Sequence, residues 1–373
     1  MAGTGATRKI ALPHSGVYVG SLDSKEVKLV LRESSATKYS PPGYLLFLRE
    51  STLMAQPFDA TRLLTSGDAV PIAEHVGADL VSSAQRGAAG FAVSENGTLV
   101  YRPAIAMQTQ LVWVDRTGKP VASVAPPGTY NNVALSPDET RVAFDRPGPT
   151  NDVWLMDLQR RITSRFTFQP PNNNVPLWSP DGRTVAFASM RNGALDVYQR
   201  PSNASGPDEP LLKLGAAPIV YPSDWSADGR FLAYYRTDPK TQLDLWILPL
   251  FGDRKPFPLL HTEFNESQGQ FSPDGRWMAY VSDQSGSSQI YVQSFPELTG
   301  NWQISIDGGS RPRWRRDGKE LFYVAPDGKL MAVTVKTGAI VEAEAPRALF
   351  ETTLPAVAQR QTYASRQTVN DFS

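Results

Sequence analysis

The chain has 373 residues, and 37 Lys and Arg residues balance 37 Asp and Glu residues to give a formal net charge of zero. This balance argues against a protein that binds nucleic acid or a membrane surface, because both need a positively charged field. Cysteine is absent, which excludes disulfides, thiolate metal sites and cysteine nucleophiles.

The N-terminal region predicts a tail and half of a sheet. Residues 1–14 lack an apolar run long enough for a secretion signal, and no later run approaches the length of a membrane span. Two short apolar segments, 17–19 and 27–31, then predict two paired strands. They resemble the outer half of a four-stranded unit, so 16–32 is interpreted as a partial blade.

Two irregular units follow. Apolar segments at 44–47 and 53–55 predict two strands of the first unit, and segments at 99–101 and 111–113 predict two strands of the second. The sequence Leu-Met-Ala at 53–55 recurs at 330–332, which supports aligning the first unit with the last.

A turn motif then recurs about every 45 residues, and a period of this length indicates a repeat architecture. In Ser-Pro-Asp-Gly, proline presets φ, aspartate bonds a nearby N–H, and glycine supplies the positive φ that leads into the next strand. We therefore interpret the motif residues as structural. The aspartates are Asp138, Asp181, Asp228, Asp274 and Asp317, and the glycines are Gly182, Gly229, Gly275 and Gly318.

Each turn lies between apolar segments, and two further strands follow in each unit. A unit of four short strands cannot bury both of its faces alone, but radial stacking around an axis buries them. The 31 prolines and 28 glycines suit such a chain of short strands and turns. The sequence therefore predicts an all-β fold, a β-propeller of four-stranded antiparallel blades. A β-sandwich is the alternative, but it does not require the same four-strand pattern in every unit.

We predict that the propeller spans residues 15–355 and has seven blades. The predicted blades lie near 40–75, 88–125, 130–168, 174–215, 219–262, 264–306 and 310–351. An eighth, composite blade would form if the C-terminal segment 356–373 closed the ring with 16–32.

These motifs resemble the WD40-like repeats of TolB-like β-propellers over nearly all of 44–350. The segments 44–49, 53–59 and 314–323 also resemble the C-terminal propeller region of certain bacterial serine/threonine protein kinases. This chain has that likeness without the kinase domain or its motifs. The resemblance implies a bacterial sensor located outside the cytoplasm; without it, a cytoplasmic location is equally open.

No catalytic constellation is apparent. Prolyl-oligopeptidase-type peptidases need a Gly-x-Ser-x-Gly elbow, and the nearest segment, 286–288, has no histidine after it. The three histidines, His14, His75 and His261, are not predicted to converge, so we expect no metal site and no cofactor. We therefore predict that the chain is not an enzyme.

The polar residues at the start of each inner strand are the candidate binding residues, because inner strands line the axis of a propeller. The candidates are Asn132, Asn174, Tyr221, Glu266, Gln268, Arg311 and Arg313. Their donors and acceptors suit a peptide or a small polar ligand. The alternative is that they are solvated loop residues or line a wet channel.

The sequence therefore predicts a monomeric, non-catalytic sensor that binds a protein, peptide or small ligand at the channel mouth. One alternative is a regulatory propeller fragment of a larger enzyme, either a protein kinase or a prolyl-oligopeptidase-type peptidase. A propeller hydrolase or lyase is the other.

Overall fold

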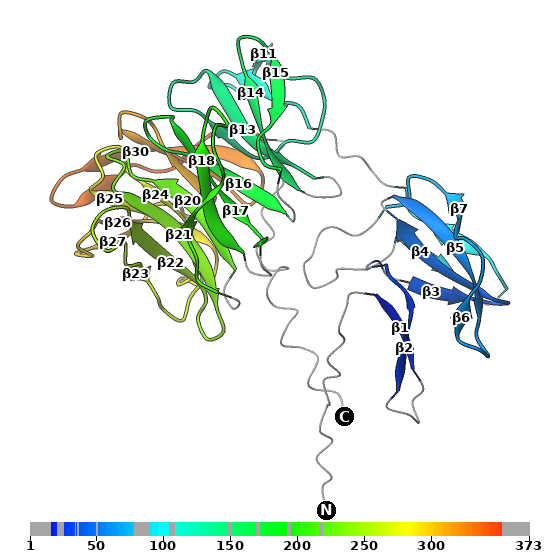
Figure 1. Ribbon diagram of the computed structural model, residues 1–373. Helices are drawn as coiled ribbons and strands as arrows, with labels where there is room; N and C mark the ends of the chain where they lie inside the picture. The colour runs from blue at the N-terminus through cyan, green and yellow to red at the C-terminus, as the bar shows by residue number, and fades with distance from the viewer. Residues whose placement is uncertain are drawn as a thin grey trace, which may run out of the picture. The chain divides into compact units, whose positions relative to one another are not determined.

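The computed structural model describes residues 16–20, 26–33, 35, 37–49, 51–77, 90–94, 96–103, 109–147, 151–168, 172–191, 195–215 and 219–352. The named elements in these residues are all β-strands, and they pair in antiparallel sheets (Figure 1). The prediction of an all-β chain built from four-stranded antiparallel sheets is confirmed. No helix in these residues has the length and apolar character that a membrane span requires.

The chain divides into two compact units, residues 1–106 with 358–373 and residues 107–357. The first unit holds two hairpins and one five-stranded sheet. The hairpins are β1 (Val17–Gly20) with β2 (Val27–Leu31), and β8 (Phe91–Val93) with β9 (Leu99–Tyr101). The sheet comprises β3 (Thr37–Ser40), β4 (Tyr44–Arg49), β5 (Thr52–Asp59), β6 (Leu64–Thr65) and β7 (Val70–Ala73).

The second unit begins with the hairpin β10 (Val112–Val114) and β11 (Pro120–Ser123) and continues with five sheets, which we number blades 3 to 7. Blade 3 comprises β12 (Asn131–Leu135), β13 (Arg141–Arg146), β14 (Asp152–Asp157) and β15 (Ile162–Arg165). Blade 4 comprises β16 (Asn173–Trp178), β17 (Thr184–Ser189), β18 (Asp196–Pro201) and β19 (Glu209–Leu212). Blade 5 comprises β20 (Val220–Trp225), β21 (Phe231–Asp238), β22 (Gln242–Pro249) and β23 (Phe257–Leu260).

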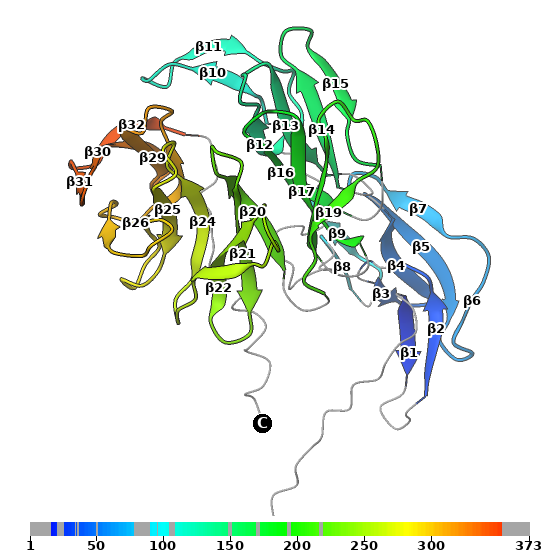
Figure 2. The same ribbon diagram turned by 60° about the vertical axis from the view of Figure 1, so that its left-hand side comes forward.

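Blade 6 comprises β24 (Glu266–Phe271), β25 (Trp277–Ser282), β26 (Gln289–Ser294) and β27 (Asn301–Gln303). Blade 7 comprises β28 (Ser310–Trp314), β29 (Glu320–Val324), β30 (Lys329–Thr337), β31 (Val341–Ala343) and β32 (Arg347–Glu351). The first strands of successive blades, β12, β16, β20, β24 and β28, are neighbours in that order, as the view in Figure 2 shows for the first four. These are the inner strands of the unit.

Two predictions about blade organisation stay open. Residues 88–125, for which the repeat predicts one blade, hold the separate hairpins β8–β9 and β10–β11. The suggested closure by 356–373 falls outside the described residues. The number of blades therefore stays a prediction.

Ser-x-Asp turns join the first and second strands of blades 3 to 6, and Arg315-Arg316-Asp317 takes this place in blade 7. In blade 4, Ser179 Oγ donates to Asp181 Oδ1 at 2.6 Å, and the same oxygen accepts the Arg183 N–H at 3.0 Å. Gly182 follows with φ of 69°, the region that favours glycine. The Ser179 hydroxyl is the main cause that lowers the pKa of Asp181. The aspartates of blades 3, 5 and 6 accept the equivalent pair of hydrogen bonds.

We expect Asp181→Ala to lower the free energy of unfolding by about 1 kcal/mol, because the buried Ser179 hydroxyl and the exposed Arg183 N–H both lose their acceptor. Urea denaturation of the variant and the wild type measures this. Asp253→Ala is the control, since Asp253 is exposed in the β22–β23 loop and accepts a single bond, from the Lys255 N–H at 3.3 Å. An equal effect in both variants would contradict a structural role for the repeated turn.

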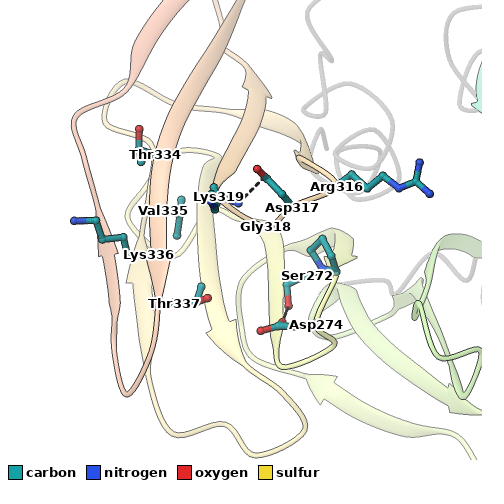
Figure 3. Close-up of a pocket in the computed structure, with 11 residues that line it drawn as sticks. Ser272, Asp274, Arg316, Asp317, Gly318, Lys319, Thr334, Val335, Lys336 and Thr337 are labelled. Atoms are coloured by element: carbon teal, nitrogen blue, oxygen red, sulfur yellow. Dashed lines mark hydrogen bonds between the residues drawn. The ribbon is translucent and has the colours of Figure 1, made fainter.

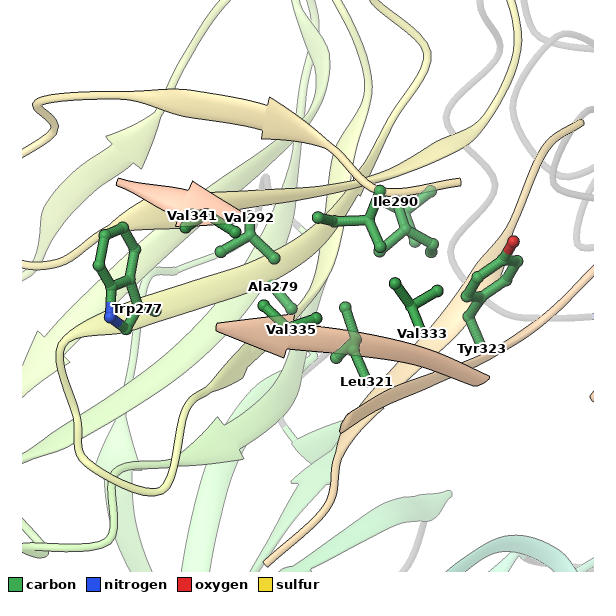
Figure 4. Close-up of a cluster of buried hydrophobic side chains, with 11 residues drawn as sticks. Trp277, Ala279, Ile290, Val292, Leu321, Tyr323, Val333, Val335 and Val341 are labelled. Atoms are coloured by element: carbon green, nitrogen blue, oxygen red, sulfur yellow. The ribbon is translucent and has the colours of Figure 1, made fainter. Parts of the chain in front are cut away.

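Apolar side chains fill the space between adjacent sheets. Between blades 6 and 7, β25 and β26 supply Trp277, Ala279, Ile290 and Val292, and these meet side chains of β29 to β31 (Figure 4). The partners are Leu321, Tyr323, Val333, Val335 and Val341. This burial against the next sheet stabilises blades that have no closed core of their own.

Inner strands also carry polar contacts across the seams between blades. Trp178 Nε1 of blade 4 donates to the Ala134 carbonyl of blade 3 at 3.0 Å, and Trp314 Nε1 of blade 7 donates to the Gln270 carbonyl of blade 6 at 3.3 Å. Both tryptophans therefore lie between adjacent blades. Trp225 differs, because its Nε1 donates to Gly229 of its own turn.

In blades 3 to 6, a polar residue near the start of the third strand is hydrogen-bonded to the segment that follows the third strand. In blade 3, Asp152 Oδ1 accepts from Thr167 Oγ1, which in turn accepts the Val153 N–H. In blade 6, Gln289 Oε1 accepts from Ser305 Oγ in the same way. Blades 4 and 5 use other donors at this place: Asp196 binds the Leu214 N–H, and Asp244 binds His261 Nδ1 at 2.8 Å.

The β10–β11 hairpin joins the two ends of the second unit. Near its base, Leu111 and Val124 pack on the core of blade 3. At its tip, the Arg116 guanidinium makes two hydrogen bonds to Glu320 of blade 7, at 2.8 and 2.9 Å. The hairpin therefore spans from blade 3 to blade 7.

Candidate functional site

The inner strands of the second unit share a bulge near their entry ends. The pairing of each inner strand with the second strand shifts register there, in all five blades. In four blades one residue at the bulge has positive φ: Asn132 at 45°, Val175 at 51°, Gln268 at 57° and Arg311 at 57°. Such conformations are strained for residues other than glycine, and they are enriched at functional sites.

On blades 3 and 4 the candidate amides belong to the seam. Asn132 Nδ2 donates to Asp145 Oδ1 at 2.7 Å, and the same oxygen accepts the Val175 N–H at 3.1 Å. Asn174 is half-buried, and its Oδ1 is buried without a hydrogen-bond partner among the described residues. Asp145 was not among the sequence candidates, although it holds the two blades together here.

On blades 6 and 7 two candidates meet directly. Gln268 Oε1 accepts the backbone N–H of Arg311 at 2.6 Å, which fixes the backbone from which the Arg311 side chain extends. The Arg311 guanidinium has no hydrogen bond, ring contact or acidic partner within 4.0 Å among the described residues. Half-buried Arg311 thus differs from Arg191, which is also half-buried and is paired with Asp208.

A second charged residue, Arg313, belongs to this group. Arg313 Nη1 donates to the carbonyl of Pro312, and the Arg313 side chain is exposed. Burial nonetheless lowers its pKa, while nearby Asp224 raises it and Arg311 lowers it. The Arg313 side chain is therefore accessible to solvent, although many protein atoms lie near its guanidinium.

Asp224 of blade 5 is the acid of this group, and the sequence prediction missed it. Burial raises its pKa to about 6, against the opposing effects of Arg313 and of the Phe271 N–H that binds its Oδ2 at 2.7 Å. Asp224 and Arg313 hold the same place in the repeat, one residue before a tryptophan, so alignment of the inner strands could have found it. We call Asp224, Gln268, Gln270, Arg311 and Arg313 the inner-strand cluster.

Glu266 belongs to a different group, in the seam between blades 5 and 6. It is 2% exposed, and Thr262 Oγ1 donates to its Oε1. Burial raises its pKa to about 7, and the neighbouring charges of Asp244 and Asp283 raise it further, while Thr262 opposes. Its Oε2 and Asp244 Oδ1 are both buried without a hydrogen-bond partner among the described residues.

The ring contact of Tyr221 is within its own blade. Its ring packs against Tyr235 of the same blade, with centroids 5.4 Å apart. The structure therefore brings together Gln268, Arg311 and Arg313 from the candidate set and adds Asp224 and Gln270.

The histidines do not form a cluster in the described part of the chain. His75 lies in the first unit, His261 binds Asp244, and His14 lies outside the described residues. Within the described ranges, no three His, Cys, Asp or Glu side chains form a group that could hold a metal ion. Ser287 Oγ accepts a hydrogen bond from Gln289 Nε2 at 3.3 Å.

A pocket lies near the turns of blades 6 and 7, lined in part by Asp274, Asp317, Lys319 and β30 (Figure 3). Both of its acids are already engaged within their own turns: Asp274 accepts from Ser272 Oγ, and Asp317 accepts the Lys319 N–H. Because both aspartates of the pocket are already hydrogen-bonded, the inner-strand cluster is the stronger candidate site.

No family model matches this chain. An uncharacterized protein of Agrobacterium fabrum is 26% identical over 159 residues, which are 39% of this chain and 53% of the relative, so the match spans about half of that protein's length. Two solved structures share the fold. TolB from Acinetobacter baumannii has a TM-score of 0.52 and 16% identity, with 82% of each chain covered.

A structure of putative TolB from Agrobacterium tumefaciens has a TM-score of 0.51 and 20% identity, and covers 62% of this chain and 86% of that chain. At these identities the likeness concerns the fold alone. The chain therefore has a TolB-like β-propeller fold.

Proposed function

We propose that this chain is a non-catalytic binding propeller that uses the inner-strand cluster to hold a protein, peptide or small polar ligand. The observation that carries the proposal is the state of Arg311. Its backbone is fixed by Gln268, yet its half-buried guanidinium has no acidic partner within 4.0 Å among the described residues. A guanidinium held in this way can form charge-assisted bonds to a ligand without first breaking an internal ion pair.

The rest of the cluster supports binding rather than chemistry. Gln270 Nε2 donates to the carbonyls of Ser223 and Gly269, so its amide is fixed. Arginine and glutamine side chains recognise polar groups but do not serve as nucleophiles or general bases at neutral pH. Asp224 is the cluster's only carboxylate, so a pair of catalytic acids is lacking in this group.

A screen of peptide pools tests the proposal. We expect a ligand found with a mixed pool of acidic, basic and neutral peptides to bind Arg311→Ala at least about tenfold more weakly than wild type, because a charge-assisted bond is lost. Isothermal titration calorimetry on the full chain measures this. Arg254→Ala is the control, since Arg254 is an exposed arginine in the β22–β23 loop. Unchanged binding in both Arg311→Ala and Arg313→Ala would refute the site.

The link to kinase propellers is a narrower proposal and rests on the sequence resemblance at 44–49, 53–59 and 314–323 alone. It would make the chain the sensor of a signalling enzyme outside the cytoplasm. Whether a kinase reading frame lies immediately upstream in the genome tests it.

A further inference from the structure

The inner strands change in character from blade to blade at one repeat position. Two residues before each turn motif stand, in blade order, Ala134, Leu177, Asp224, Gln270 and Arg313. The position is apolar in blades 3 and 4, and acidic, amide and basic in blades 5, 6 and 7. The charged residues at this position therefore lie in blades 5 and 7, on either side of Gln270 of blade 6.

Asp224 does not neutralise Arg311 or Arg313 by forming an ion pair within 4.0 Å in the described part of the chain. Asp224 and Arg313 influence each other's pKa, yet they form no ion pair within 4.0 Å among the described residues. Asp224 Oδ2 instead accepts the Phe271 N–H. Arg311 adds a second positive charge beside Arg313 and lowers the pKa of the Arg313 guanidinium.

An anion between the two guanidiniums would relieve this repulsion. A carboxylate matches the planar fork of a guanidinium and can accept two parallel hydrogen bonds from it. Asp224 disfavours a dianion such as phosphate at this place, because its own negative charge lies near Arg313. A ligand group with one negative charge and an adjacent N–H suits both the two arginines and Asp224, since the charge can bind the arginines and the N–H can donate to Asp224.

We infer that the inner-strand cluster binds an acidic peptide segment, with a Glu or Asp carboxylate between Arg311 and Arg313 and a peptide N–H donated to Asp224. The inference rests on the proposed function and adds the chemistry of the ligand. A peptide fits better than a free small acid because it carries the carboxylate and the amide N–H in one residue.

Fluorescence anisotropy with three labelled probes tests the inference on the full chain: an alternating Glu-Ala octapeptide, its Gln-Ala analogue and a Lys-Ala analogue. We expect the Glu-Ala peptide to bind at least about tenfold more tightly than the Gln-Ala peptide, since charge-assisted bonds are roughly twice as strong as neutral ones. Arg311→Ala and Arg313→Ala should each weaken its binding by about 10- to 100-fold. Asp224→Asn should weaken it less, and Arg254→Ala should not change it.

The outcomes separate this inference from the proposed function. Equal binding of the Glu-Ala and Gln-Ala peptides, both lost in Arg311→Ala, would overturn the acidic preference and leave the binding site standing. Binding that is indifferent to Arg311→Ala and Arg313→Ala would overturn both. Inorganic phosphate that competes as strongly as free glutamate would show a general anion site and overturn the peptide assignment, as would no binding of the Glu-Ala peptide.

Discussion

Glu320→Ala is expected to lower the free energy of unfolding of the second unit by about 3 kcal/mol, the lower end of what breaking a buried ion pair costs. The Glu320 side chain is 8% exposed and is bonded by Arg116, Arg315 and Arg347. We place the effect at the lower end because these arginines are 39–61% exposed and solvent screens them. Guanidinium denaturation measures the loss, with Glu342→Ala on exposed β31 as the control.

A double-mutant cycle between Arg116 and Glu320 isolates the contact that joins the β10–β11 hairpin to blade 7. We expect a measurable favourable coupling free energy, since the pair forms two parallel bonds. The Arg116 hydrogen bond is the main cause that lowers the pKa of Glu320 to about 2, from 4.5. This contribution is therefore present above about pH 4.5 and is lost as pH falls toward 2. A coupling below about 0.3 kcal/mol would show that the hairpin does not depend on this pair.

Glu266→Gln is expected to stabilise the protein at pH 8 by about 2–3 kcal/mol while leaving its stability at pH 4.5 nearly unchanged. Burial raises the folded-state pKa of Glu266 to about 7, above the 4.5 of the unfolded chain. Protonation therefore favours the folded state: its contribution is complete below about pH 4.5 and is lost as pH rises through about 7. Glutamine is neutral at every pH and removes this loss.

The repeat itself supports the glutamine substitution. Asn173 holds the equivalent place at the start of β16, and its Nδ2 donates to Asp152 Oδ1 at 3.4 Å. A glutamine at 266 offers the same kind of donor to Asp244. Unfolding measured between pH 4.5 and 8 tests this, with exposed Glu263→Gln as the control from the same loop. An equal stability difference at both pH values would exclude Glu266 as the titrating group.

The fold followed from the sequence because its signals are local and repeated. The turn around Asp181 needs a serine two residues before and a glycine after, and blades 4 to 6 keep all three residues. Blade 3 has Glu139 in place of the glycine and blade 7 has Arg315 in place of the serine, but the aspartate recurs in all five units. The four-stranded sheets then follow from the apolar segments on both sides. The contact of the β10–β11 hairpin with blade 7 did not follow, because Arg116 and Glu320 are 204 residues apart in the sequence.

The candidate site was only partly accessible from the sequence. The entry positions led to Arg311, Arg313 and Gln268, but polarity alone could not separate them from Glu266, which the structure places in a seam with Asp244. Asp224 holds the same repeat position as Arg313, but its burial and its charge relation to Arg313 are visible only in the structure. Its role depends on charge relations across three blades, which a single repeat does not encode.

A crystal structure of the full chain with the Glu-Ala octapeptide tests the central claim, that the inner-strand cluster binds a ligand, most directly. We expect a peptide carboxylate about 3 Å from the guanidinium nitrogens of Arg311 and Arg313, and a peptide N–H directed at Asp224. A peptide seated instead in the pocket near Asp274 and Asp317, or elsewhere away from the inner strands, would contradict it.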